Sequence, residues 1–349
     1  MRASPLLAVC LIAGLAATEG TAADGAKCKL ARIVDWPVRI VRNHIVVDGA
    51  INGQKVDITL DTGATASLIL RSTAVRFDLP AREVSGRRMF GIGGETKTEI
   101  ATVDDFKVGE VSTKGMRFLV AGERDVGEGV DVLLGEDFLR RFDVEFDLAH
   151  GAVRLYQSRD CDGVSLAFWT KEIAGEVEIE PIDEAHPQIG LTVRINDKPI
   201  AAILDSGASS SVVTKEDAAS VGVTPDTPGV AAGRSFQGLG AKSVDTWTGS
   251  FQSFAIGNER IPDIRIRFAD LYKDMTYANT GSNIARNVIR TRPMLLGADF
   301  LRAHRTLVAH SQRRLYFTYS GGPVFLADPA APPPTSRPDG DSSAKTGGD

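Results

Sequence analysis

The same short phrase occurs twice in this chain, and each copy ends in an aspartate followed by small residues. The first copy covers residues 51–64 and ends in Asp-Thr-Gly-Ala, which begins at Asp61. The second covers residues 195–208 and ends in Asp-Ser-Gly-Ala, which begins at Asp205. The copies align without a gap, so that residue n corresponds to residue n + 144. One aspartate in such a turn would be weak evidence, whereas two predict a duplicated domain that brings two carboxylates together.

Three further landmarks recur in the same order in both halves. They are a glycine-rich segment, the pattern Leu-Leu-Gly-x-Asp-Phe-Leu and a closing Arg-Leu-Tyr. The matched pairs are residues 90–93 with 237–240, 133–139 with 295–301, and 154–156 with 314–316. The period is too long for a solenoid and suits two copies of a small domain. We expect the first domain at residues 24–160 and the second at 161–327.

The two ends of the chain are expected to lie outside this duplicated fold. Met1 and Arg2 begin a positive region, residues 6–17 are apolar, and small residues continue to Ala23. This pattern is typical of a secretory signal peptide, so we expect residues 1–23 to be removed and the protein to be periplasmic or secreted. A retained membrane anchor is disfavoured, because the apolar run is too short to span a bilayer. Residues 328–349 are rich in Pro, Gly, Ser and Asp, which predicts a disordered tail.

The composition limits the classes of partner and cofactor. The formal net charge is −5 and the arginines are scattered, so nothing predicts nucleic-acid binding. The five histidines lack metal-ligand spacing, and no Ser-His-Asp or Cys-His arrangement is supported. We therefore expect no metal and no organic cofactor.

Two cysteines, Cys28 and Cys161, remain once the signal peptide is removed. They bracket the first repeat, and an exported chain meets an oxidising compartment. An even cysteine count in such a chain favours a disulfide over two free thiols. The bond is expected to join the start of the mature chain to the joint between the domains.

Each half has the pattern of β structure, and each aspartate follows a strand that leaves a hairpin. Residues 44–51 and 54–60 flank Asn52-Gly53, a strong signal for a type I′ turn. Residues 188–195 and 198–204 flank Asn196-Asp197 in the same way. Short helices are expected at residues 72–77, 136–141, 215–220 and 298–304.

The two turns, together with the repeated Leu-Leu-Gly-x-Asp-Phe-Leu, resemble the retropepsin-type aspartic peptidases and are most similar to their bacterial branch. The resemblance covers nearly all of residues 35–325 as two tandem copies. In that family one copy forms half an active site, and two copies pair across a pseudo-twofold axis. The resemblance implies an all-β fold with two acid-protease-type β-barrel lobes in one monomeric chain and the active site between them, as in the pepsins.

The resemblance also implies that Asp61 and Asp205 are a catalytic pair. Two carboxylates held close in a poorly solvated site cannot both ionise, so they share one proton. One then takes a proton from a bound water, while the other donates to the carbonyl oxygen of the substrate. The alternative for each Asp-x-Gly alone is an ordinary β-turn.

Four neighbours of the pair are expected to support it. Gly63 and Gly207 allow backbone N–H groups to come near the carboxylates. The resemblance implies that the hydroxyls of Thr62 and Ser206 interlock across the two turns. It also places the two Leu-Leu-Gly elements beneath the turns as apolar support. The aspartates of the second motif, at 137 and 299, are interpreted as capping or structural residues and not as a second pair.

The glycine-rich segments occupy the positions of the family's flaps, which open and close over an extended peptide. The alternative for each segment is a plain hairpin with a bulge. The candidate flap residues are Phe90, Gly91, Ile92, Gly93, Gly238, Leu239 and Gly240. The second copy carries an insertion near residues 271–292 that the first lacks. A surface loop is the favoured interpretation, and the alternatives are a cover for the cleft or a partner site.

The function expected from the sequence is that of an exported aspartic endopeptidase acting on an extended peptide or protein. The alternative is a periplasmic peptide-binding or scaffold protein that keeps the fold without turnover. A third possibility is that the halves pair between two chains. In pepsins a serine or threonine follows Asp-x-Gly and favours the charged pair, but here Ala64 and Ala208 follow it. We therefore expect activity in weakly acidic to near-neutral solution.

Overall fold

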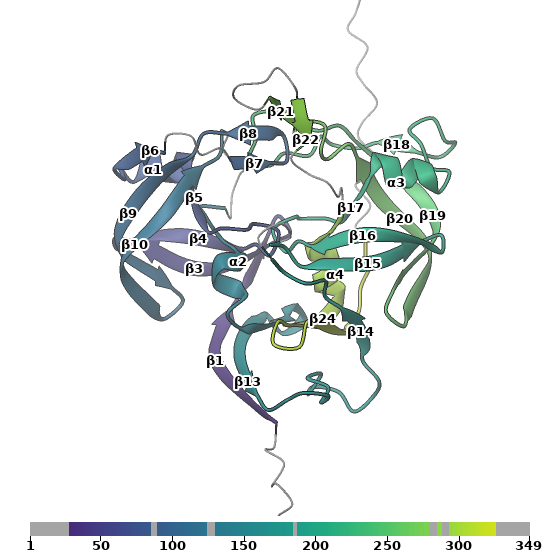
Figure 1. The fold of residues 1–349 in the computed structure, drawn as a ribbon, viewed down its shortest axis with the longest axis horizontal. Helices are drawn as coiled ribbons and strands as arrows, with labels where there is room; N and C mark the ends of the chain where they lie inside the picture. The colour runs from purple at the N-terminus through teal and green to yellow at the C-terminus, as the bar shows by residue number, and fades with distance from the viewer. Residues whose placement is uncertain are drawn as a thin grey trace, which may run out of the picture.

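A computed structural model describes residues 28–84, 89–123, 130–183, 187–274, 276–278, 285–287 and 293–325. Strands make up 51% of the structure and helices 9%, with one closed six-stranded barrel in each repeat. Figure 1 shows the two barrels side by side. The expected all-β, two-lobed fold is confirmed. The expected signal segment and C-terminal tail lie outside the described residues.

The first lobe is built on an eight-stranded sheet with two short helices. In sheet order, its strands are β2 (Arg39–Val41), β3 (His44–Ile51), β4 (Gln54–Leu60), β11 (Val132–Leu134), β5 (Leu68–Leu70), β10 (Val111–Ala121), β9 (Glu99–Val108) and β6 (Ala81–Glu83). The helices are α1 (Arg71–Arg76) and α2 (Glu136–Leu139). Asn52 and Gly53 have φ values of 49° and 82°, so both residues are left-handed, as a type I′ turn requires. The expected hairpin is confirmed.

The second lobe repeats this plan. In sheet order, its strands are β15 (Gly190–Ile195), β16 (Lys198–Leu204), β23 (Met294–Leu296), β17 (Val212–Thr214), β20 (Glu259–Ala269), β19 (Thr246–Ile256) and β18 (Ala231–Ala232). The helices are α3 (Lys215–Ser220) and α4 (Ala298–Ala303), as expected. Pro199 lies opposite Arg194 in the hairpin, and β23 pairs with β16 only from Ala202 onward. The missing N–H of the proline therefore interrupts no bond to β23.

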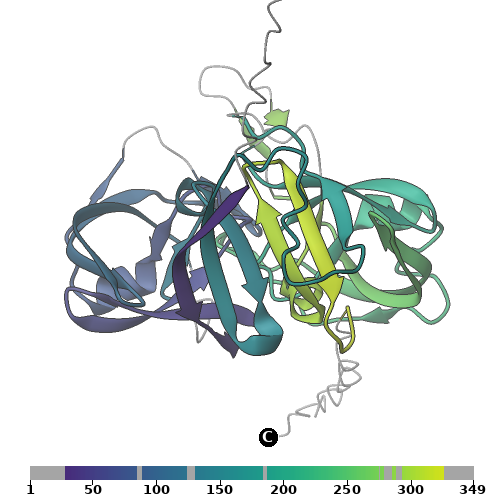
Figure 2. The same cartoon turned by 90° about the horizontal axis from the view of Figure 1, so that it is seen from below.

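A third sheet joins the two repeats beneath the barrels. Its six strands are, in order, β1 (Lys29–Pro37), β13 (Ala152–Arg159), β12 (Asp143–Asp147), β24 (His304–Ala309), β25 (Arg314–Tyr319) and β14 (Gly175–Glu178). The join is made by β12 of the first repeat and β24 of the second, with Val144 opposite Val308. Figure 2 shows the purple and teal strands of the first repeat lying beside the yellow strands of the second. The halves thus share a continuous sheet.

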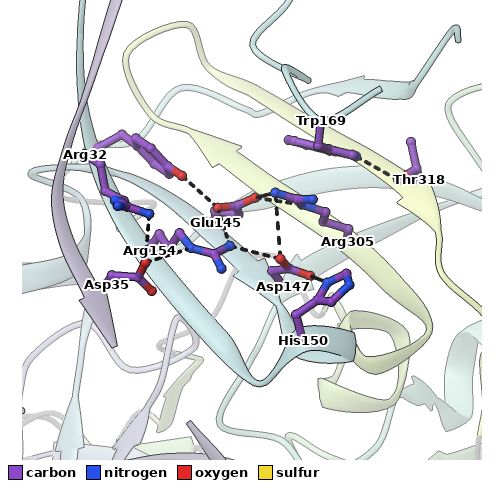
Figure 3. Close-up of polar contacts among 10 residues, drawn as sticks. Arg32, Asp35, Glu145, Asp147, His150, Arg154, Trp169, Arg305 and Thr318 are labelled. Carbon is purple, nitrogen blue, oxygen red and sulfur yellow. Dashed lines mark hydrogen bonds and ion pairs between the residues drawn. The ribbon is translucent and has the colours of Figure 1, made fainter. Parts of the chain in front are cut away.

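A buried charge network lies on this shared sheet (Figure 3). Glu145 on β12 is fully buried and accepts from Arg305 Nε of the second repeat at 2.7 Å. Its other oxygen accepts from Arg154 at 3.1 Å and from the Tyr156 hydroxyl at 2.9 Å, both within the first repeat. Trp169 covers the Arg305 guanidinium at 5.1 Å. One carboxylate therefore binds cations from both halves.

The disulfide expected from the sequence is present between Cys28 and Cys161. It joins the residue before β1 to the segment that leads from the first repeat to the second. No helix in the described ranges is long and apolar enough to cross a membrane.

Candidate active site

Each candidate aspartate is positioned by the strand that precedes it and by the Leu-Leu-Gly strand beside it. Asp61 follows β4 and its backbone N–H donates to the Leu134 carbonyl at 3.0 Å. Asp205 follows β16 and donates to the Leu296 carbonyl at 2.9 Å. These two leucines are buried in the main core, so the second motif supports the turns as expected.

The two carboxyl groups meet between the lobes. Asp61 Oδ1 accepts from the backbone N–H groups of Gly63 and Ala64, at 3.0 and 2.9 Å. Asp205 Oδ1 accepts from those of Gly207 and Ala208 at the same distances. The two carboxyl groups are close enough to shift one another's pKa, and each lies beside the glycine of the opposite turn. The pairing therefore occurs within one chain.

The glycine of each turn is required by the opposite carboxyl group. A Cβ atom added to Gly63 would lie 2.4 Å from Asp205 Cγ, and one added to Gly207 would lie 2.3 Å from Asp61 Cγ. Both distances are far below van der Waals contact. No larger residue fits at either position without separating the pair.

The hydroxyls of the two turns interlock, as the resemblance implied. Thr62 Oγ1 donates to the Leu204 carbonyl and Ser206 Oγ to the Leu60 carbonyl, each at 2.7 Å. Each hydroxyl also accepts from the backbone N–H of the other residue, at 2.9 and 3.0 Å. Both side chains are buried, and the four bonds fix the separation of the turns.

Burial and mutual charge keep a proton on this pair. Burial, followed by the charge of Asp205, raises the pKa of Asp61 to about 8. Burial also raises the pKa of Asp205, although its two backbone donors oppose the shift. The proton belongs to the pair, so neither residue is assigned as the acid or the base.

A family model described as aspartyl protease matches residues 47–138 and 191–300, which include both turns and both Leu-Leu-Gly motifs. The chain belongs to the aspartyl protease family. No curated protein matches the chain.

Two residues of this aspartyl protease fold escaped the interpretation of the sequence. Gln188 Nε2 donates to the Gly63 carbonyl at 3.1 Å, from the second lobe to the turn of the first. His44, at the equivalent position of the first lobe, lies near the Gly207 backbone, and burial lowers its pKa. The two positions are 144 apart, the offset of the repeat, but the side chains are chemically unlike. Only the alignment of the halves could have revealed them.

The aspartates of the second motif are structural, and one of them also binds the first turn of its helix. Asp137 Oδ1 accepts from the backbone N–H of Ser67 at 2.9 Å and from its hydroxyl at 2.6 Å. Asp299 accepts from Ser211 in the same way, at 2.8 and 2.6 Å, and its Oδ1 also accepts from the Phe300 N–H at 2.9 Å. The N-cap position of α2 and of α4 is itself a glycine, which has no capping side chain. The expectation of a capping or structural role is therefore supported.

The flaps of this aspartyl protease differ between the lobes. The first is the expected hairpin of β7 (Met89–Gly91) and β8 (Gly94–Thr96). The second is a loop closed by one isolated antiparallel bridge between Phe236 and Val244. The second flap uses its remaining backbone groups for contacts with the first lobe and not for a ladder of its own.

The two flaps hydrogen-bond to one another. Gly240 donates to the Ile92 carbonyl and Lys242 to the Gly93 carbonyl, both at 3.0 Å. Gly93 has a φ of 89°, and a Cβ there would lie 2.2 Å from the Lys242 carbonyl oxygen. Glycine is therefore needed at position 93, where the two flaps contact one another. The Lys242 ammonium also pairs with Asp274 at 2.6 Å.

The described part of the chain holds no group of three or more His, Cys, Asp or Glu side chains arranged to bind a metal ion. Two buried carboxyl groups that share one proton can supply acid–base chemistry.

Proposed function

We propose that the protein is an exported aspartic endopeptidase in which Asp61 and Asp205 activate water. The observation that carries this proposal is the approach of two buried carboxyl groups, each held by two backbone N–H donors and each set against the glycine of the opposite turn. The family match supports a protease in general. The geometry supports the pair as its reactive groups.

The reaction follows from the single shared proton. The ionised carboxylate takes a proton from water while the water oxygen bonds to the peptide carbonyl carbon. The protonated carboxyl gives its proton to the carbonyl oxygen, which forms a neutral tetrahedral diol. The C–N bond then breaks as a proton passes to nitrogen, which leaves a carboxylic acid and an amine. The pair ends with one proton, as it began.

The substrate is an extended peptide or protein held between the lobes and beneath the flaps, with main-chain hydrogen bonds to the flap backbone. We propose a monomeric enzyme of the periplasm or extracellular space that uses no cofactor and binds no nucleic acid. Mature protein with an N-terminus near Asp24 is the result expected from N-terminal sequencing. An intact Met1 in exported protein would contradict signal cleavage.

The pH range follows from the donors around the pair. Each turn supplies two backbone N–H groups, and alanine stands at the next position in both turns. No hydroxyl at that position stabilises the charged pair, so the shared proton persists to higher pH. We propose an optimum between weakly acidic and near-neutral pH. An optimum in strong acid would contradict this reasoning.

The test is replacement of each aspartate by its isosteric amide. Asp61→Asn and Asp205→Asn should each abolish peptide cleavage with little effect on folding. The double variant should be little worse than either single one, because the groups act as a unit. The control is Asp104→Asn at an exposed position, which should leave cleavage unchanged.

Two outcomes of the same experiment would overturn the proposal. A fully active Asp205→Asn variant would show that the second repeat is only structural. Tight peptide binding without cleavage by the unaltered chain would favour the alternative of a binding or scaffold protein. Mixing the two single variants should not restore activity, since neither chain supplies a complete pair.

A further inference from the structure

Two apolar clusters of equivalent position lie on the flap side of the two turns. The first-lobe pocket contains Leu68, Leu70, Ala121, Val130 and Leu133. The second-lobe pocket contains Ile203, Ala208, Val212, Val244, Ala269, Leu271, Tyr272 and Leu295. The same structural positions recur in both, at the strand after the turn, at the end of the long hairpin, and at the first leucine of Leu-Leu-Gly.

Each of these clusters, called pockets here, is contacted by the flap tip of the other lobe. Ile92, from the first flap, packs against the second-lobe pocket. Leu239, from the second flap, packs against the first-lobe pocket. Ile92 and Leu239 are counterparts in the repeat, so the exchange is mutual. The Glu123 N–H donates to the Leu239 carbonyl at 3.1 Å and holds the second tip in place.

The second-lobe pocket reaches the reactive group. Ala208 belongs to that pocket, and its N–H donates to Asp205 Oδ1 at 2.9 Å. A side chain that entered this pocket would therefore lie directly beside the proposed dyad. The Ile92 side chain packs against this surface, so an aliphatic side chain is compatible with it.

Among the buried members of the two pockets, one residue is aromatic: Tyr272, at the start of the second-lobe insertion. Tyr272 is 8% exposed and belongs to the cluster against which both Ile92 and Phe236 pack. Its hydroxyl donates to the Pro293 carbonyl at 2.6 Å, which ties the two ends of the insertion together. Burial, followed by the charge of Asp205, raises its pKa, consistent with a place near the dyad. The first-lobe pocket has no aromatic residue among its described members.

We propose that Tyr272 is a specificity-determining residue, and that Ile92 and Leu239 occupy the places of substrate side chains in the free enzyme. The inference rests on the proposed function. The anchored ring fixes the size of the second-lobe pocket, so that pocket accepts aliphatic side chains and rejects aromatic ones. The first-lobe pocket, without this ring, sets the preference on the other side of the scissile bond.

The test uses peptides in which the residues on the two sides of the scissile bond are varied separately through Leu, Ile, Phe and Trp. Removing a large ring from one pocket changes discrimination by about tenfold or more. Tyr272→Ala should raise kcat/KM for Phe relative to Leu by that factor on one side only. Tyr272→Phe keeps the ring and should keep the aliphatic preference.

The matched control is Met89→Ala, because Met89 packs against the first-lobe pocket. It should change the preference on the opposite side of the bond. Equal changes on both sides, a uniform loss for all peptides, or no change with Tyr272→Ala would overturn the assignment of Tyr272.

Cleavage by the unaltered chain tests the proposed function separately from the role of Tyr272. If that chain cleaves none of the peptides, the endopeptidase proposal fails. The same peptides are therefore also bound to the Asp61→Asn chain, with and without Tyr272→Ala. A one-sided change in affinity supports the role of Tyr272 even without turnover, and an unchanged order of affinities refutes it.

Discussion

Glu136 and His310 form a buried pair of titratable groups that the proposed chemistry does not use. Glu136 begins α2 and is 1% exposed, and its Oε2 lies 3.7 Å from His310 Nε2. Within the described residues, neither carboxyl oxygen nor this ring nitrogen has a hydrogen-bond partner. The equivalent of Glu136 in the second repeat is Ala298. The chain itself thus supplies a residue that this position accommodates.

Burial shifts the pKa values of the two groups in opposite directions. It raises the pKa of Glu136 from 4.5 to about 8, with smaller contributions from Arg140, Asp61 and Asp137. It lowers the pKa of His310 from 6.5 to about 4, with a smaller opposing effect of Asp143 and a smaller lowering effect of Arg140. The folded pair therefore keeps one proton between about pH 4 and 8.

The linkage of this pair to stability follows from counting protons in the two states. Between pH 4.5 and 6.5 the unfolded pair also holds one proton, so its contribution to stability is flat. Above pH 6.5 the unfolded pair holds none while the folded pair still holds one. Stability then falls by about 2 kcal/mol up to pH 8, because one pH unit corresponds to about 1.4 kcal/mol.

The perturbation is Glu136→Ala, and the assay is urea unfolding at pH 5, 6.5 and 8. In this variant only His310 of the pair titrates. Its contribution to the free energy of unfolding therefore rises up to pH 6.5 and is constant above pH 6.5. The free energy of unfolding of the variant relative to the unaltered chain should therefore increase by about 4 kcal/mol from pH 5 to pH 8. The difference between the chains removes the contribution of the Asp61–Asp205 pair. The control is Glu172→Ala at an exposed position, whose difference should not vary with pH. A constant difference for Glu136→Ala would refute the reasoning.

Three other features give further expected outcomes. Reducing the Cys28–Cys161 bond opens a loop with a sequence separation of 133 residues and should cost about 5 kcal/mol, measured by unfolding with and without reductant. Arg305→Met should cost about 3–5 kcal/mol in the same assay, because it leaves the central carboxylate of the inter-lobe network buried without this cation. Lys242→Met removes the ion pair with Asp274 and should speed peptide association, measured by stopped flow. Added salt screens this ion pair, so it should speed association with the unaltered chain but not with the variant.

The parts of the fold that sequence predicted are those with local signals. The Asn52-Gly53 turn requires left-handed backbone at two successive residues, and this preference alone specifies the hairpin. The paired carboxylates were also predictable, because the same motif occurs in both halves and two similar halves are expected to pack symmetrically. Whether Asp61 and Asp205 are catalytic stays a prediction.

The parts that sequence did not predict depend on contacts between distant segments. The second flap lacks a regular hairpin because its backbone groups bind the first flap at Ile92 and Gly93. The aspartates of the second motif bind Ser67 and Ser211, which lie far from them in the sequence. No local pattern records either contact.

The strand pairing of β12 with β24 has a consequence for how the site depends on concentration. A site that takes one carboxylate from each of two separate chains is lost when dilution separates them. Here both carboxylates belong to one molecule and the sheet between the halves is continuous. Assembly is intramolecular, so it has an effective concentration that dilution cannot lower. The covalent link also lets the halves diverge, as Glu136 and Ala298 have done, since a substitution in one copy need not fit at its symmetry mate.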